Sequence, residues 1–337
     1  MRNYSDARIR IILISVPVLI IFISIFIGRY HASVEDVIRL VGSKLFPWIE
    51  AQYQPAMETA IWNVRIPRII VVFLSGMSLA VAGAVFQGVF HNPLVSDHVL
   101  GVSNGASFGA TLALLFSMPI AVVQASAFFF GILSVTTALG LSRIYRNQST
   151  LTLVLSGIII SGFFSSFVSF MKTIADPLNK MPTIVFWLMG SFAKVSSGDL
   201  TYAFPAMLIP VICLYLLRWQ INVLAAGDES AKSLGINVNA LRLALIMLCT
   251  FSAAASVAIS GVVGWVGLVI PHISRILVGP DYKRLIPMCI SLGGTYLLIM
   301  DNFARMLTMY EIPIGIFTAL IGAPLFAYLL KKGSGWE

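Results

Sequence analysis

Two apolar runs between residues 65 and 110, joined by the polar hinge Asn92-Pro93, constrain this chain more than any other feature. Each run is about long enough to cross a bilayer. Small residues recur at every fourth position of both runs, at Gly76, Ala80, Ala84 and Gly88 and then at Gly101, Gly105 and Gly109. This spacing places them on one helical face, where a second membrane helix can approach closely. The pattern predicts a tightly packed multi-helix transporter or channel, with the hinge and the second glycine face in its core.

Composition also indicates a membrane protein. Apolar residues make up 58% of the 337 residues and charged residues only 11%, against about 25% charged residues in ordinary soluble domains. The formal net charge of +8 comes from Lys and Arg at helix ends and in short loops, as expected of membrane proteins, so we expect no nucleic-acid partner. Cys213, Cys249 and Cys289 lie far apart inside apolar runs, which predicts small apolar roles and no metal site.

The predicted fold is all-α, with one transmembrane domain over residues 1–337 and about ten membrane helices. The apolar segments span residues 11–28, 67–88, 98–117, 120–141, 151–171, 201–218, 241–260, 263–278, 285–303 and 313–330. Pro and Gly interrupt several of them, which is tolerated where the backbone faces protein or a cavity. The first segment follows a basic N-terminus without a cleavage pattern, so we expect it to remain as a membrane helix.

Lys and Arg in the short loops predict that both termini are cytoplasmic. The residues assigned to the inner side are Arg143, Arg146, Arg218, Lys232, Arg242, Lys283, Arg284, Lys331 and Lys332. Residues 31–64 then form a long outer connection, in which Ser33 can cap a short helix. Residues 184–190 form either a half-helix tucked along the bundle or a surface helix anchored at the membrane interface by Trp187.

The inner connection, residues 219–240, predicts a short helix displayed in the cytosol. Asp228 can cap this helix and Gly235 can end it in the left-handed conformation. Ala231 and Leu234, spaced i and i+3, would share one small apolar face that suits insertion into a groove of a partner protein. The alternative is an ordinary surface helix between two spans.

No segment predicts enzymatic chemistry. The chain lacks a phosphate-binding loop and the common hydrolase motifs, so any ATP that drives it is hydrolysed by another chain. An ion-coupled carrier is the main alternative, but such carriers keep ionisable residues near the membrane midplane. Here Asp97, His98 and Asp301 fall near the ends of segments, which favours an external motor.

Three stretches resemble the permease subunits of metal-chelate ABC importers, the FecCD-like family. The first combines Gln87, the hinge residues 92–94 and residues 100–110. The second, residues 261–287, contains Pro271 and His272, and the third is the last span, residues 311–326. The resemblance implies a cobalamin-permease-like bundle that imports an iron–siderophore, haem or cobalamin. A molybdate or tungstate importer of the same family is the alternative.

The resemblance also implies partners and roles. It implies a homodimer in the cell inner membrane, two ATPase subunits that use ATP and Mg, an external substrate-binding protein, and no cofactor on this chain. It implies an ATPase-coupling role for residues 228–235, including Glu229. Pro271 itself predicts a break in the helix of the second stretch, at least a kink beside the inner opening, with His272 near the inner mouth. The resemblance implies that Arg65, Arg68 and Arg305 dock the binding protein by pairing with its carboxylates; simple anchoring of helix ends is the alternative.

Overall fold

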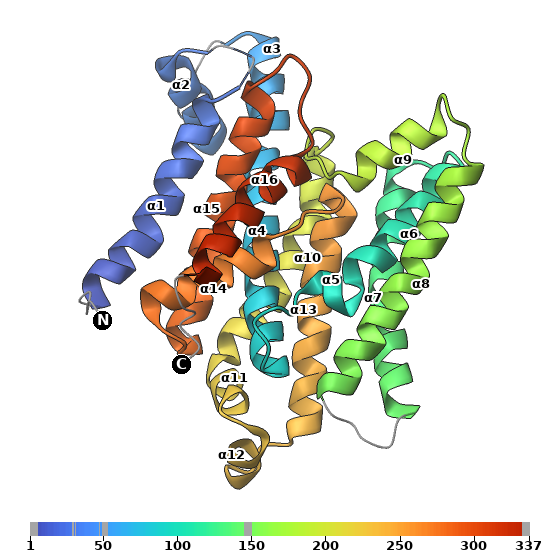
Figure 1. Cartoon of the computed structure of the whole chain (residues 1–337). Coiled ribbons are helices and arrows are strands. Elements are labelled where there is room, and N and C mark those ends of the chain that lie inside the picture. Colours follow the sequence, from blue (N-terminus) through green and yellow to red (C-terminus); the bar gives the residue numbers. More distant parts are fainter. Residues whose placement is uncertain are drawn as a thin grey trace.

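The computed structural model describes residues 6–28, 30, 32–46, 48, 53–144 and 150–331, and this part of the chain contains helices and no strand (Figure 1). The elements are α1 (Asp6–Phe26), α2 (Val34–Leu45), α3 (Pro55–Glu58), the π-helix η1 (Thr59–Arg65), α4 (Ile66–Phe90), α5 (Asp97–Leu100), α6 (Val102–Leu115), α7 (Ile120–Ile144), α8 (Thr150–Ile174), α9 (Lys180–Leu188), α10 (Ser197–Leu216), α11 (Arg218–Ala225), α12 (Asp228–Ser233), α13 (Val238–Ser260), α14 (Val266–Val278), α15 (Tyr282–Met306) and α16 (Ile314–Lys331). Arg146 and Lys332, assigned above to the inner side, lie outside the described residues.

The all-α prediction is confirmed, and each of the ten apolar segments contains a helix. Within the described residues, six helices are long and apolar enough to cross a membrane. Shorter apolar helices occupy four further segments, at Leu13–Phe26, Val102–Leu115, Val266–Val278 and Ile314–Leu329. The bundle therefore combines full spans with helices such as α6 and α14, of 14 and 13 residues, which are too short to cross alone.

Helix α4 forms the centre of the bundle (Figure 1), and every residue from Leu74 to Phe90 is buried. Its small residues set how close the neighbouring helices lie. A Cβ at Gly76 would overlap the carbonyl oxygen of Gly293 in α15, and a Cβ at Gly83 would overlap that of Gly267 in α14. Backbone-to-backbone contact of this kind is how membrane helices associate without a hydrophobic driving force.

The second glycine face packs against α7. A Cβ at Gly105 would overlap the Phe130 carbonyl oxygen and the Ser134 Cβ, and one at Gly109 would overlap the Ser126 carbonyl oxygen. The Ser126 hydroxyl in turn donates to the Gly109 carbonyl oxygen at 2.8 Å. The two glycine faces therefore serve different contacts, one between α4 and α14–α15, the other between α6 and α7.

Two predicted spans are wrong in detail, because the chain breaks inside them. Segment 98–117 divides into α5 and α6 at Gly101, which adopts φ +90°, a conformation open to glycine at little cost. Segment 263–278 becomes helical only at Val266, after Trp265 at φ +71°. Both breaks lie inside protein, where an interrupted helix is tolerated.

The stretch predicted at residues 184–190 forms α9, with Ile184 buried and the helix packed against α6. Its end is tied to the start of α16, because Ile314 N donates to the Gly190 carbonyl oxygen and Gly315 N to that of Met189. Helices α2 and α9 lie at one end of the bundle. Helix α1 begins and α16 ends towards the other end, where α11 and α12 lie (Figure 1).

Enlarging Gly105 to Leu is expected to force α6 and α7 apart. Overpacking a well-packed interior costs about 1–3 kcal/mol, so the melting temperature in detergent should fall while membrane insertion persists. Gly140→Leu on α7 is the matched control, because nothing lies within 4 Å of the position of its Cβ. Equal melting of both variants would contradict this packing.

Candidate functional site

A buried ion-pair network occupies the end of the bundle that carries α2 and α9 (Figure 1). The Arg68 guanidinium donates to both oxygens of Asp301, the closest at 2.8 Å, and to both oxygens of Glu311 at 2.9 Å. The Arg68 and Asp301 side chains are only 6% and 1% exposed. Glu311 precedes α16, so this one arginine joins α4, α15 and the segment that leads into α16.

Two further arginines complete this end. Arg305 Nε lies 3.3 Å from Asp301 Oδ2, as their i, i+4 spacing suggests, and Arg305 also donates to Asn302. Arg65 donates to the carbonyl oxygens of Ile25 at 2.7 Å and Tyr30 at 3.1 Å. These contacts attach α1 and the segment after it to α4.

The structure corrects the expected setting of Arg65, Arg68 and Arg305. Direct pairing with a docking protein needs exposed guanidinium groups, whereas these three residues are buried and bonded within the chain. Their sequence positions at helix ends predicted exposure. The acceptors of Arg65 and Arg68 come from distant segments, whereas those of Arg305 include the nearby Asp301 and Asn302. Docking at this face stays a prediction. Glu311 is partly exposed, with 24% of its side chain accessible, but it is acidic and cannot pair with the carboxylates of a partner.

Arg68→Met is expected to destabilise the folded protein by about 3–5 kcal/mol. The substitution removes one of the two arginines that pair with the buried carboxylate of Asp301. The matched control is Arg39→Met. Arg39 pairs with Glu35 in α2, but both side chains are more than half exposed, and exposed pairs contribute about 0–1 kcal/mol. Thermal unfolding in detergent measures the difference, and equal losses would show that the network contributes no more than a surface pair.

Backbone conformation and hydrogen bonds fix the hinge that follows α4. His91 adopts φ +49°, and Asn92 N donates to the Gln87 carbonyl oxygen at 3.1 Å, closing the helix in the way that left-handed caps do. The Asn92 side chain then accepts from Leu94 N at 2.9 Å. Pro93 lies between these bonds, so the turn is fixed on both sides of it. The expected place of the hinge in the core is wrong, because Asn92 and Pro93 are only partly buried and the adjoining His91 and Leu94 are exposed.

The expected break at Pro271 is absent, since α14 continues from Val266 to Val278. A proline has no N–H to donate to the carbonyl four residues earlier, here that of Gly267. The Gln87 side chain of α4 donates to that oxygen instead, at 3.2 Å, and Gln87 accepts from Arg275. One glutamine thus repairs the helix and joins α4 to α14.

His272 does not line an opening in the described structure. It is 3% exposed, and its ring packs edge-on against Phe326 of α16 with 5.9 Å between ring centroids. The sequence prediction placed His272 near the inner mouth. The cover by α16 comes from a segment more than fifty residues away, which local pattern could not reveal.

Helices α11 and α12 project from the end of the bundle opposite α2 and α9 (Figure 1). Gly235 takes φ +75° and Ile236 N donates to the Ala231 carbonyl oxygen at 3.1 Å, which ends α12 as expected. The expected cap is wrong, because Asp228 is the first residue of α12 and not the capping residue before it. The Asp228 carboxylate pairs with Arg242 at 2.7 Å.

The second expectation, that Ala231 and Leu234 share one apolar face of α12, is also wrong. Ala231 is fully buried in the bundle and Leu234 is 59% exposed, so the two side chains do not present one surface. Leu234 and the exposed Glu229 remain available to a partner. Ala231 instead fixes α12 to the bundle, which suits transmission of a displacement better than a loosely attached helix would.

A chain of hydrogen bonds connects this region to the centre. Asn222 of α11 donates to Asp281 Oδ1 at 2.6 Å and accepts from Tyr282 N at 3.0 Å. The Tyr282 hydroxyl donates to the Ala84 carbonyl oxygen of α4 at 2.9 Å. Sequence analysis missed these residues and Arg275, because each bond joins segments that are distant in the chain.

Hydroxyl-bearing and small residues follow one exposed face of α8, with the spacing of successive helical turns. They are Gly162, Ser165, Ser166, Ser169 and Thr173. The hydroxyls of Ser166, Ser169 and Thr173 each donate to the carbonyl oxygen four residues earlier.

Within the described residues no cluster of three His, Cys, Asp or Glu side chains could hold a metal ion.

The model of the FecCD transport family matches residues 16–332. The chain belongs to this family. The molybdate import system permease protein MolB of Haemophilus influenzae is 42% identical over 92% of both chains. A permease of an iron chelatin transport system of Helicobacter pylori is 38% identical over 83% of this chain and 85% of its own.

A solved structure gives the same result for the fold. It is described as an inward-facing conformation of a metal-chelate type ABC transporter, and it aligns with a TM-score of 0.86, 40% identity and coverage of 97% of this chain and 99% of its own. The chain is therefore a multi-pass membrane permease of an ABC importer family, and the resemblance noted in the sequence is confirmed.

Proposed function

We propose that this permease is a homodimer that imports a metal chelate, with two ATPase subunits at its inner end and a substrate-binding protein at its outer end. The family match over residues 16–332 carries the proposal. The absence of a phosphate-binding loop from the sequence agrees with a motor on separate chains. Helices α11 and α12 project where such a motor would bind (Figure 1).

The polar face of α8 supports a pathway beside a second copy. Ser165, Ser166 and Ser169 are exposed on a helix whose other exposed residues are mostly apolar. Hydroxyl groups of this kind suit contact with water or close packing against another helix better than contact with lipid chains. We therefore place the cargo pathway between α8 and the partner copy.

Transport is expected to depend on ATP and on no ion gradient. The buried charges of the described spans are held by protein partners, Arg68 by Asp301 and Glu311, and Arg275 by Gln87. In proteoliposomes with the ATPase and binding protein, collapsing the proton and sodium gradients should leave uptake intact, and omitting ATP should abolish it. Gradient-driven uptake by this chain alone would overturn the proposal in favour of an ion-coupled carrier.

The α12 turn is expected to transmit the motor's movement. Gly235→Val places a β-branched residue at φ +75°, which costs about 1–2 kcal/mol, although no atom lies within 4 Å of the Cβ position. Uptake per ATP hydrolysed should fall. Gly235→Asn is the control, because Asn tolerates this conformation and should retain coupling. Normal coupling in the valine variant would contradict the assignment.

Molybdate is the second candidate cargo, favoured by the 42% identity with a molybdate permease over 92% of the chain. The main candidate, an iron chelate, rests on the iron chelatin relative and on the solved metal-chelate type transporter. Radiolabelled ferric chelate and radiolabelled molybdate should be offered in parallel to the reconstituted importer. ATP-dependent accumulation of only one of them identifies the cargo, and accumulation of molybdate alone would reject the metal chelate.

A further inference from the structure

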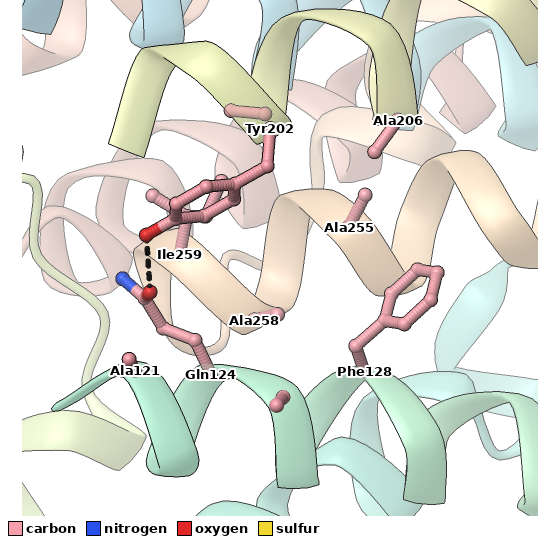
Figure 2. A pocket seen from close by; sticks show the side chains of 10 residues that line it. Ala121, Gln124, Phe128, Tyr202, Ala206, Ala255, Ala258 and Ile259 are labelled. Carbon is pink, nitrogen blue, oxygen red and sulfur yellow. Dashed lines mark hydrogen bonds between the residues drawn. The ribbon is translucent and has the colours of Figure 1, made fainter. Parts of the chain in front are cut away.

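A groove runs between α7 and α10 over α13, with a volume of about 340 Å³ (Figure 2). Six alanines from these three helices form most of its wall, and they are Ala121, Ala125, Ala203, Ala206, Ala255 and Ala258. Ala121 and Ala125 are exposed and Ala206 is partly exposed. The groove therefore opens on the side of the bundle, and its volume is within the range of sites that hold small ligands.

The remaining lining of the groove is apolar, except for two polar side chains at one end. Phe128 and Ile259 complete the apolar lining, while Tyr202 and Gln124 face one another across the groove (Figure 2). The Tyr202 hydroxyl lies 2.7 Å from Gln124 Oε1 and 2.5 Å from Asp199 Oδ1, and Gln124 Nε2 donates to the same Asp199 oxygen at 2.9 Å. These polar atoms bond to one another, so the groove itself offers an apolar surface.

A second cavity of about 360 Å³ continues from this polar end and shares Gln124 and Ile259 with the groove. Its further lining includes Ser191, Thr183 and the exposed Lys194, which lies in the segment between α9 and α10. No carboxylate of the described residues forms an ion pair with Lys194. Lys194 and these two hydroxyl groups thus lie beyond the apolar groove, in a cavity whose remaining lining is mostly apolar.

We propose that the two cavities together bind an anionic phospholipid, with one acyl chain in the alanine groove and the phosphate beside Lys194. In a chain that spans a membrane, the surrounding bilayer supplies hydrocarbon to any apolar recess on the side of the bundle. Lys attracts anionic head groups, and Trp187, which lines the second cavity, is a residue type common at the head-group level. The proposal depends on membrane insertion and not on the identity of the cargo.

Native mass spectrometry of the delipidated full-length permease, incubated with phosphatidylglycerol or phosphatidylcholine vesicles, tests this site. The wild type should retain phosphatidylglycerol in preference. Ala206→Phe and Ala125→Phe fill the groove from two helices and should abolish retention of either lipid. Lys194→Glu should lower phosphatidylglycerol retention about fivefold or more, the factor that one basic residue contributes at an anionic surface.

Two controls match these variants. Ala244→Phe enlarges an exposed alanine of α13 outside both cavities, and Lys172→Glu reverses a lysine near the end of α8 that lines neither; both should bind like the wild type. Unchanged retention in both groove variants would overturn the proposal. Conversion of a wild-type dimer to monomers by Ala206→Phe would overturn it in favour of a second copy seated on this face. Equal retention of the two lipids, unaltered by Lys194→Glu, would overturn the phosphate assignment.

Discussion

Close contact between helix backbones is the constraint on which this structure depends. A membrane bundle cannot rely on expulsion of water to join its helices, so it needs short distances and many small contacts. Gly76 meets Gly293, and Gly83 meets Gly267, without any side chain between them. These contacts place α14 and α15 directly on α4, and every other helix is arranged around that centre.

Close packing brings polar groups into the interior, and the structure pairs the principal ones across helices. Pro271 leaves the Gly267 carbonyl without its helical donor, and Gln87 supplies one because Gly83 allows α4 to lie so near. Arg68 is satisfied by Asp301 and Glu311 in the same way. An unpaired polar group would be costly here, so these residues fix which helices can be neighbours.

The two ends of the bundle are built differently, which bears on transport. At the end that carries α2 and α9, one buried arginine, Arg68, holds α4, α15 and the segment before α16 together. At the opposite end, Asn222 joins α11 to the start of α15, and Tyr282 continues to the backbone of α4. In the proposed importer, a displacement of α11 and α12 by the ATPase would reach the central helix through these hydrogen bonds, while the Arg68 network would hold the other end together.

The sequence by itself determined the membrane class, the ten apolar segments, the close-packing role of the glycine faces and the family, because hydropathy, small-residue spacing and motifs are local patterns. Gly235 also followed from local pattern, since the left-handed turn after a short helix favours glycine. Only the tertiary structure decided that Arg65, Arg68 and Arg305 are buried, that Ala231 and Leu234 face different surroundings, and that α14 continues through Pro271. The physical reason is that burial depends on segments distant in the chain: α1 and the segment after it meet Arg65, Asp301 and Glu311 meet Arg68, and Gln87 of α4 replaces the hydrogen bond that Pro271 cannot make.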